Sequence, residues 1–143
     1  MAEEIISKLK DKFSKNVIRR IDEKSPKRIY VHIEAAYIVA VVNYLFHELG
    51  GRFAIATGTD TPEGIQIFYH FAFDKKGVVV SICVLLDKDK PEIETTCIGI
   101  KATEWIEREI HELLGVNFRN HPDLRHLLLC DDWPEGDYPL RRK

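Results

Sequence analysis

The strongest constraint on the fold is a series of three β-rich runs in the middle of the chain. They span residues 53–57, 65–73 and 78–86 and are separated by two turn sequences, Thr59–Gly64 and Asp74–Gly77. Turns this short join antiparallel strands, because a parallel crossover needs a dozen or more residues. We therefore expect three consecutive antiparallel strands. The run 65–73 is apolar on one face and only partly polar on the other, so we expect both of its faces to be covered.

Helical patterns flank these runs on both sides. Apolar residues recur at helical spacing over residues 3–14, 35–49 and 103–114, and glycine follows the second and third of these segments. Two shorter runs, 17–21 and 28–33, have the residue types of strands. A chain of 143 residues has the size of one domain. The sequence thus predicts a single α+β domain, with an antiparallel or mixed sheet and helices packed on it.

Charge and composition exclude several classes of function. The chain has 21 basic and 23 acidic residues, a net charge of −2, which argues against nucleic-acid binding. No uncharged apolar run approaches the ~18–20 residues that cross a bilayer. The first residues also lack the pattern of a secretory signal, so we expect a cytoplasmic protein.

The charge is unevenly distributed along the chain. Residues 1–28 carry nine basic and five acidic side chains. We expect this segment to be a solvated helix face followed by a turn, with contact to anionic lipid or to an acidic partner as the alternative.

Cysteines and histidines offer no established metal-binding pattern. The three cysteines form no CxxC pair, so we expect reduced thiols rather than a disulfide, zinc or iron–sulfur framework. The sequence His111–Gly115 begins like the zinc-protease motif but has glycine in the place of the second histidine. A metal site built from His111, His121 and His126 is an alternative that no spacing requires.

The last predicted helix carries charged residues in two kinds of position. Glu104, Arg108 and Glu112 are spaced four residues apart, and we expect them to pair along the exposed face. Glu109 lies instead at the rim of the apolar stripe. It is either an ordinary edge residue or a carboxylate buried against an arginine at the base of the tail. The candidate arginines are Arg125 and Arg141.

Residues 121–143 are predicted to form an extended tail of the same domain, whose core spans residues 1–120. The tail is rich in leucine and aromatic residues, which interfaces favour, and its three prolines prevent a regular element. A segment of this composition is too apolar to lie free in water. It must lie on its own domain or on another chain, and we expect a neighbouring subunit to order its apolar and arginine side chains.

The same region carries a long and specific pattern. It runs Glu107-Arg108-Glu109-Ile110-His111-Glu112-Leu113-Leu114, then after six residues His121-Pro122-Asp123-Leu124-Arg125, then Asp132-Trp133-Pro134-Glu135-Gly136 and Pro139-Leu140-Arg141. This pattern resembles the signature of the NADH dehydrogenase (complex I) C-subunit family, which includes the corresponding subunits of energy-converting membrane-bound nickel–iron hydrogenases. The resemblance is close over residues 105–142. Before them the chain agrees only in the order and type of its elements.

Two departures make the chain more similar to the hydrogenase branch. His111-Glu112 stands where respiratory members usually have an aromatic residue followed by aspartate, and the chain ends soon after Arg141.

The resemblance implies an assembly function without catalysis. Such a subunit is a hydrophilic part of the peripheral arm of a membrane-bound, ion-translocating redox complex, at the cytoplasmic face of the membrane. It is held against the large catalytic subunit and the small iron–sulfur subunit, and it has no cofactor of its own. Iron–sulfur clusters, and a nickel–iron site in the hydrogenase branch, belong to those partners. The motif positions expected to dock partners or support local structure are Glu107, Arg108, Glu109, His121, Pro122, Asp123, Arg125, Trp133, Pro139, Leu140 and Arg141.

Two other functions are open on the residues alone. One is a stand-alone α+β protein-binding module that uses the mixed-polarity face of its sheet. The other is a small histidine-dependent metalloenzyme. Purification separates the three: a docking protein is recovered from membranes with several partners, a module is soluble alone, and a metalloenzyme retains stoichiometric metal.

We predict that the chain produced alone under anaerobic conditions is colourless and free of stoichiometric metal. The reason is that the sequence has no ligand spacing for an iron–sulfur cluster or nickel and no phosphate-binding loop for flavin or nicotinamide. Elemental analysis and an absorption spectrum check this. A visible chromophore or a metal at one equivalent would contradict it.

Overall fold

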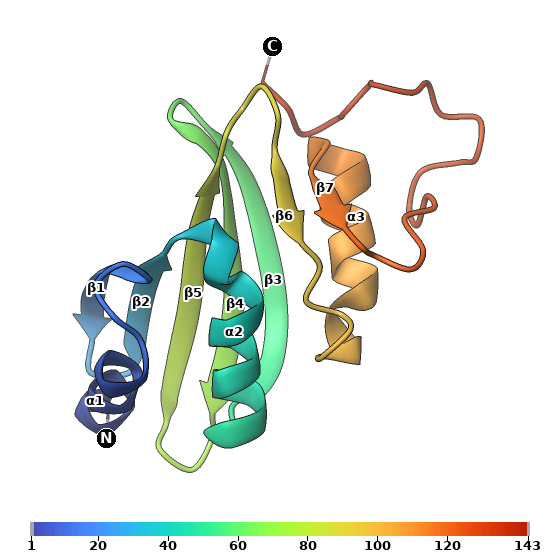
Figure 1. Ribbon diagram of the computed structural model, residues 1–143. Helices are drawn as coiled ribbons and strands as arrows, with labels where there is room; N and C mark the ends of the chain where they lie inside the picture. The colour runs from blue at the N-terminus through green and yellow to red at the C-terminus, as the bar shows by residue number, and fades with distance from the viewer. Residues whose placement is uncertain (1, 143) are drawn as a thin grey trace.

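A five-stranded sheet forms the centre of the computed structural model, which describes residues 2–142 (Figure 1). Its strands are β1 (Ile18–Ser25), β2 (Arg28–Ile33), β3 (Arg52–Thr61), β4 (Gly64–Phe73) and β5 (Val78–Leu86), in the spatial order β1-β2-β5-β4-β3. The three predicted antiparallel strands are confirmed, since β4 pairs antiparallel with both β3 and β5. Strand β2 runs parallel to β5, so the sheet is mixed.

Three helices are present where periodicity predicts them. They are α1 (Ala2–Lys12), α2 (Ile38–Asn43) and α3 (Glu104–Leu114). The predicted helix 35–49 is continuous but changes pitch, with a 3₁₀ turn at Ala35–Tyr37 before α2 and a wider π turn at Tyr44–Glu48 after it. The α+β prediction is confirmed.

A second, two-stranded parallel sheet lies beside α3 and has no counterpart in the sequence patterns. It consists of β6 (Glu92–Glu94) and β7 (Asn117–Arg119), which flank α3 in the chain. Runs of three residues are too short to show an alternating pattern, which explains why they were not predicted. Together β6, α3 and β7 form a unit at the β3 end of the large sheet (Figure 1).

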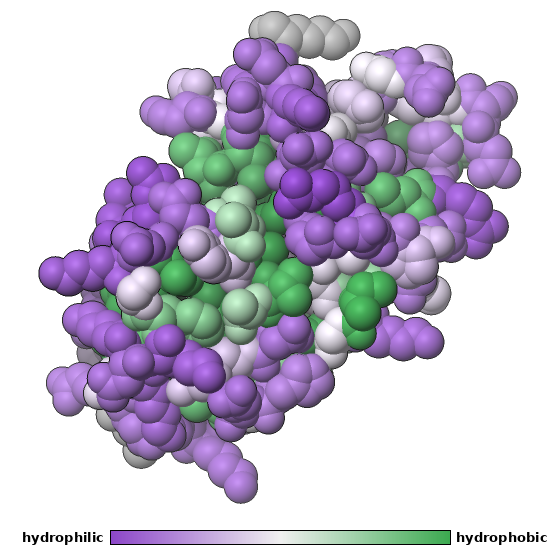
Figure 2. All heavy atoms as spheres, in the orientation of Figure 1, coloured by the Kyte–Doolittle hydropathy of each residue, from purple (hydrophilic) through white to green (hydrophobic). Residues whose placement is uncertain are grey.

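The helices cover one face of the large sheet. Buried side chains of β4 such as Tyr69 and Phe71 join α1 and α2 residues in one core. Close packing of α3 on β3 depends on Gly58, because a Cβ there would meet the side chains of Leu114 and Ile110. Figure 2 shows the helix-bearing side, where apolar side chains gather around α2 between hydrophilic margins.

The other face of the sheet is less covered than the sequence predicts. Within residues 2–142 no helix covers it, although cover was expected on both faces of β4. Half-buried rings pack against one another there: Phe68 lies edge-on to Tyr30, with ring centroids 6.0 Å apart, and stacks on His70. Mutual packing of aromatic rings explains why this face of β4 is so apolar without a covering layer.

Over its described residues, 121–142, the tail has no helix or strand, as predicted, and it runs along α3 before returning to the sheet (Figure 1). Its last described residue, Arg142, donates its backbone N–H to Asp60 Oδ2 in β3, at 2.6 Å. The end of the tail therefore lies on its own domain, one of the two surfaces considered for it. Lys143, the last residue of the predicted tail, lies outside the described residues.

Candidate functional site

Glu107, in the first turn of α3, is a fully buried carboxylate with several donors. It accepts hydrogen bonds from the hydroxyl of Tyr69 (2.7 Å), the hydroxyl of Thr96 (2.8 Å) and the backbone N–H of Thr96 (3.1 Å). The hydroxyl of Thr95 also donates to it. Burial, with the Glu107 charge adding to it, raises the pKa of Tyr69 well above its usual value, so that this hydroxyl keeps its proton. The carboxylate thus ties α3 to β4 and to the segment after β6.

Arg108 and Glu112, one helical turn apart, hold the beginning of the tail by its backbone. Arg108 donates from Nε to the carbonyl oxygen of Arg125 (3.0 Å) and from Nη2 to that of His126 (2.7 Å). Glu112 accepts the N–H groups of the three residues Leu127–Leu129, at 2.9, 2.6 and 3.4 Å. His126 Nδ1 lies 3.2 Å from the same carboxylate. We call these two side chains with backbone 125–129 the tail clamp.

The tail clamp works because irregular backbone beside a helix has no ladder to satisfy its polar groups. Arg108 supplies donors to two carbonyl groups, and Glu112 supplies acceptors to three amides. Burial alone would raise the pKa of Glu112, but the amides of Leu128, Leu127 and Leu129, together with His126, outweigh burial and lower it. Glu112 is therefore ionised at neutral pH and accepts all of these hydrogen bonds.

This arrangement corrects the prediction for the charged residues of α3. Arg108 and Glu112 were expected to pair with Glu104 along an exposed face, but both are buried and bind tail backbone. Glu109 was considered as a buried carboxylate paired with an arginine. It is half-buried, and within residues 2–142 it has no ion pair or hydrogen bond.

The two arginines proposed for Glu109 are engaged elsewhere. Arg125 pairs with Asp123 through its Nε at 2.7 Å, and this contact lowers the pKa of Asp123 to about 2. Arg141 donates to the carbonyl oxygens of Leu114 (3.1 Å) and Lys88 (2.9 Å). Arg141 thus joins the tail to the end of α3 and to the segment after β5.

Asp60 anchors the end of the tail on the sheet. Its side chain is buried in β3, 3.0 Å from Lys88 Nζ and 3.8 Å from Arg141 Nε. The hydrogen bond from the backbone N–H of Arg142 lowers the pKa of this carboxyl group most, and the contact with Lys88 lowers it further. The ring of Tyr138 lies so close to Gly115 that a Cβ at that position would clash. Gly115 also has a φ of 78°, which glycine adopts without strain.

One group of possible metal ligands converges among residues 2–142, namely Cys97, Glu107 and His121, whose ligand atoms lie within 4.8 Å of one another. Both ring nitrogens of His121 are already engaged: the N–H of Asp123 donates to Nδ1 (3.0 Å), which leaves Nε2 protonated to donate to the carbonyl of Glu104 (3.0 Å). Burial raises the pKa of Cys97, so its thiol is not ready to ligate. These hydrogen bonds account for the cluster without a metal.

His111 and His126, the other two histidines of the metal alternative, bind protein groups. His111 Nδ1 lies 2.7 Å from the carbonyl oxygen of Val116, at the end of α3. His126 belongs to the tail clamp. Neither is part of the converging group.

The remaining predicted site residues lie on the surface or at its edge. Pro122, Pro139 and Leu140 are exposed, whereas Trp133 is half-buried and donates its Nε1–H to the carbonyl of Asp137, at 2.8 Å. Among the predicted site residues, Arg108, Arg125 and His121 thus lie together around α3. Trp133 instead contacts a neighbouring residue of the tail.

Sequence reasoning missed Tyr69, Thr95, Thr96 and Asp60. Tyr69 is one apolar position among many in β4, and the two threonines lie 12 and 11 residues before Glu107. No pattern at such spacing indicates a shared hydrogen-bond network. Glu112 lies inside the motif, but its helical spacing placed it on the exposed face, whereas the structure buries it.

Large apolar side chains point outward around this charged interior. Trp105 is 66% exposed, Leu128 63% and Leu140 56%. Leu140 and the exposed Ile55 of β3 border a groove of about 230 Å³ whose walls include Ile106, Leu113 and the half-buried Glu109. We call the exposed residues Trp105, Leu128, Leu140 and Ile55 the apolar rim.

Comparison with known proteins identifies the family. The pattern of the family described as respiratory-chain NADH dehydrogenase, 30 Kd subunit, matches residues 31–143. The chain belongs to this family. The resemblance seen in the motif is thereby confirmed.

Similar proteins come from several kinds of complex within this family. The C-subunit of F(420)H(2) dehydrogenase from Methanosarcina mazei is 34% identical, over 99% of this chain and 90% of that protein. Membrane-bound hydrogenase subunit beta of Pyrococcus furiosus is 30% identical, over 98% and 84%. A chain in the structure of an archaeal membrane-bound sulfane sulfur reductase superposes with a TM-score of 0.80 at 24% identity, over 98% and 83%, and shows the same fold.

We predict that Glu112→Ala lowers the free energy of unfolding by roughly 3 kcal/mol, because three part-buried amides of the tail lose the carboxylate that accepts their hydrogen bonds. Glu109→Ala and Glu104→Ala should each change it by less than about 0.5 kcal/mol. Urea unfolding of the three variants tests this. A loss for Glu109→Ala as large as that for Glu112→Ala would mean that Glu109 has the partner the structure does not show.

We also predict an acid-dependent loss of stability through Glu112. Its pKa is lowered on folding, so its contribution is full above the unfolded pKa of about 4.3 and is lost as the pH falls through the folded value. Melting temperatures between about pH 6 and pH 3 should fall less steeply for Glu112→Gln than for the unmodified chain. Parallel curves would contradict this.

Proposed function

We propose that the chain is a non-catalytic assembly subunit of a membrane-bound, ion-translocating redox complex of the complex I and nickel–iron hydrogenase superfamily. It docks the large catalytic subunit and the small iron–sulfur subunit in the peripheral arm. Iron–sulfur clusters, and a nickel–iron site where the complex is a hydrogenase, reside in those partners. The subunit lies at the cytoplasmic face of the membrane.

The observation that carries this proposal is the inverted distribution of charge and apolar surface around α3. Glu107, Arg108 and Glu112 are buried and bind the chain's own segments, whereas the apolar rim is exposed. The tail clamp holds the backbone on both sides of Leu128, so the point from which this exposed side chain extends is fixed. Preordered apolar anchors lose little conformational entropy when a partner covers them, which is the property of a docking surface.

Family membership supports attachment to a larger assembly. The similar proteins are subunits of dehydrogenase and hydrogenase complexes by name, one of them called membrane-bound. No helix in residues 2–142 has the length and apolar character to span a bilayer. Attachment to the membrane through partner subunits is the arrangement that fits both facts.

The two alternative functions gain no specific support. A histidine-dependent metalloenzyme needs free imidazole nitrogens, and those of His121 are hydrogen-bonded on both sides. A stand-alone module that binds through the mixed-polarity face of its sheet would leave the apolar rim around α3 exposed to water.

Replacing two rim residues tests the docking surface. We predict that Trp105→Ala combined with Leu128→Ala greatly reduces recovery of the chain in complex purified from native membranes, while its melting temperature alone stays nearly unchanged, because both side chains are exposed. Leu85→Ala removes a similarly exposed leucine from β5, outside the rim, and serves as the control. Normal recovery of the double variant would contradict the proposal.

Removing residues 131–143 tests the tail. This deletion keeps the tail clamp but removes Leu140 and the contacts of Arg141 and Arg142. We predict that circular dichroism shows a folded domain with a lower melting temperature, since Asp60 loses its backbone donor, and that the truncated chain fails to enter the complex.

A full-length control separates the loss of stability from the loss of assembly. Arg141→Ala removes an anchoring side chain of the tail while keeping Leu140, so it should lower the melting temperature and still assemble. Assembly of the truncated chain at normal yield would show that the end of the tail is not a docking element.

A further inference from the structure

A groove between α1 and β1 lies at the far end of the sheet from α3. It has a volume of about 530 Å³. Its apolar lining comes from Phe13, Ile18 and Ile21, and its rim is formed by Lys10, Lys15, Arg19 and Arg20. These four cations give the groove a positive charge, although the chain as a whole has a net negative charge. The groove also differs in this respect from the apolar surface around α3.

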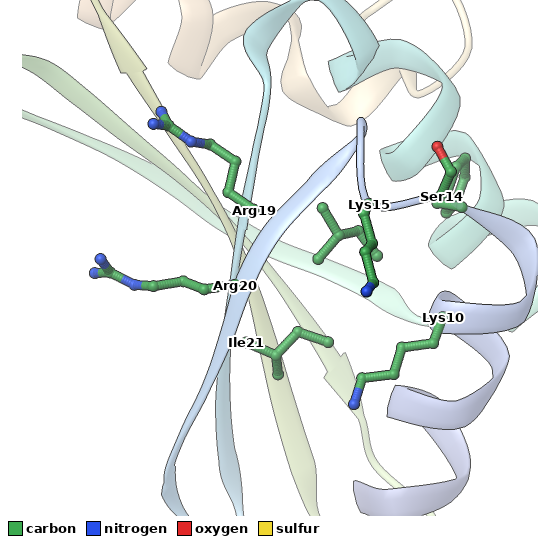
Figure 3. A pocket seen from close by; sticks show the side chains of 8 residues that line it. Lys10, Ser14, Lys15, Arg19, Arg20 and Ile21 are labelled. Atoms are coloured by element: carbon green, nitrogen blue, oxygen red, sulfur yellow. The ribbon is translucent and has the colours of Figure 1, made fainter.

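Two of these cations have no counter-charge. Within residues 2–142, Lys10 and Lys15 form no ion pair, whereas Arg19 lies 3.4 Å from Glu34 and Arg20 lies 3.2 Å from Asp22. Figure 3 shows the side chains of Lys10 and Lys15 reaching into the space beside Ile21, between α1 and β1. Both lysines are exposed, so an anionic group in this space would lie beside two cations that have no ion pair among residues 2–142.

The position of β1 favours an extended polypeptide as the occupant. Strand β1 is the last strand of the sheet, and among the described residues it pairs only with β2. A polypeptide can therefore lie alongside its outer edge. A register shift between Ile18 and Arg20 interrupts the regular part of β1 near its start, and the cationic side chains discourage another cationic strand from pairing there. A segment carrying carboxylates would meet opposite charges instead.

We propose that this groove binds an extended acidic segment of a partner polypeptide, in which carboxylates alternate with large apolar side chains. Apolar side chains would pack on Phe13, Ile18 and Ile21, and carboxylates would meet Lys10 and Lys15. In Figure 3 the lysine side chains lie on the α1 side of β1 and the arginine side chains extend from its opposite side, so these cations do not form one flat surface of the kind that a membrane would contact. This second docking surface is independent of the apolar rim.

A binding measurement on the full chain tests the proposal. The probe is a fluorescent peptide that alternates glutamate with leucine and matches the eight-residue length of β1. We expect saturable binding that weakens at least about tenfold when salt rises from about 0.05 M to about 0.5 M. A peptide with serine in place of leucine should bind at least about fivefold more weakly, because it loses the apolar floor.

Charge reversal locates the site. Lys10→Glu combined with Lys15→Glu should weaken peptide binding by at least about tenfold. Lys90→Glu combined with Lys101→Glu makes the same change in net charge at exposed lysines outside the groove, and should leave binding within about twofold. Circular dichroism verifies that all variants fold.

Three results would overturn the proposal. The first is an equal loss of affinity in the two double variants, which would indicate non-specific charge attraction. The second is equal binding of the leucine and serine peptides. The third is no peptide binding together with binding to phosphatidylglycerol vesicles that depends on Lys10 and Lys15, which would identify a lipid contact instead.

Discussion

The structure depends on the satisfaction of buried charge along α3. A charged side chain that leaves water costs several kcal/mol unless hydrogen bonds replace its hydration. Glu107, Arg108 and Glu112 obtain these bonds from hydroxyl groups and from backbone of segments that are neither helix nor strand. Each carboxylate or guanidinium therefore fixes a piece of chain that could not satisfy its own polar groups.

This dependence is mutual. The segment around Thr95 and Thr96 needs Glu107 as an acceptor, and backbone 125–129 needs both parts of the tail clamp. Removing any one of these partners leaves a buried group of the other unpaired, which costs more than the hydrogen bond contributes when both are present. A charged motif in the last third of the chain therefore acts first as internal support.

The outer surface follows from this inward use of charge. Three charged side chains of α3, those of Glu107, Arg108 and Glu112, are buried, and the side chains left outside on α3 and the tail include large apolar ones such as Trp105 and Leu128. An edge of such residues at the β3 end and a cationic groove at the β1 end give the sheet two chemically different borders. In the proposed docking role, the apolar border would supply affinity and the cationic border would help to select the partner.

The sequence by itself determined the class of fold, the antiparallel order of the three central strands, the helices and the family, because these depend on periodicity, short turns and a long local motif. It located the charged motif at residues 107–112 but placed Arg108 and Glu112 on the wrong face and singled out Glu109. Helical spacing describes which residues share a face, not what lies against it. Only the tertiary structure decided that, because the partners Tyr69, Thr96 and backbone 125–129 come from distant parts of the chain and are brought to α3 by packing.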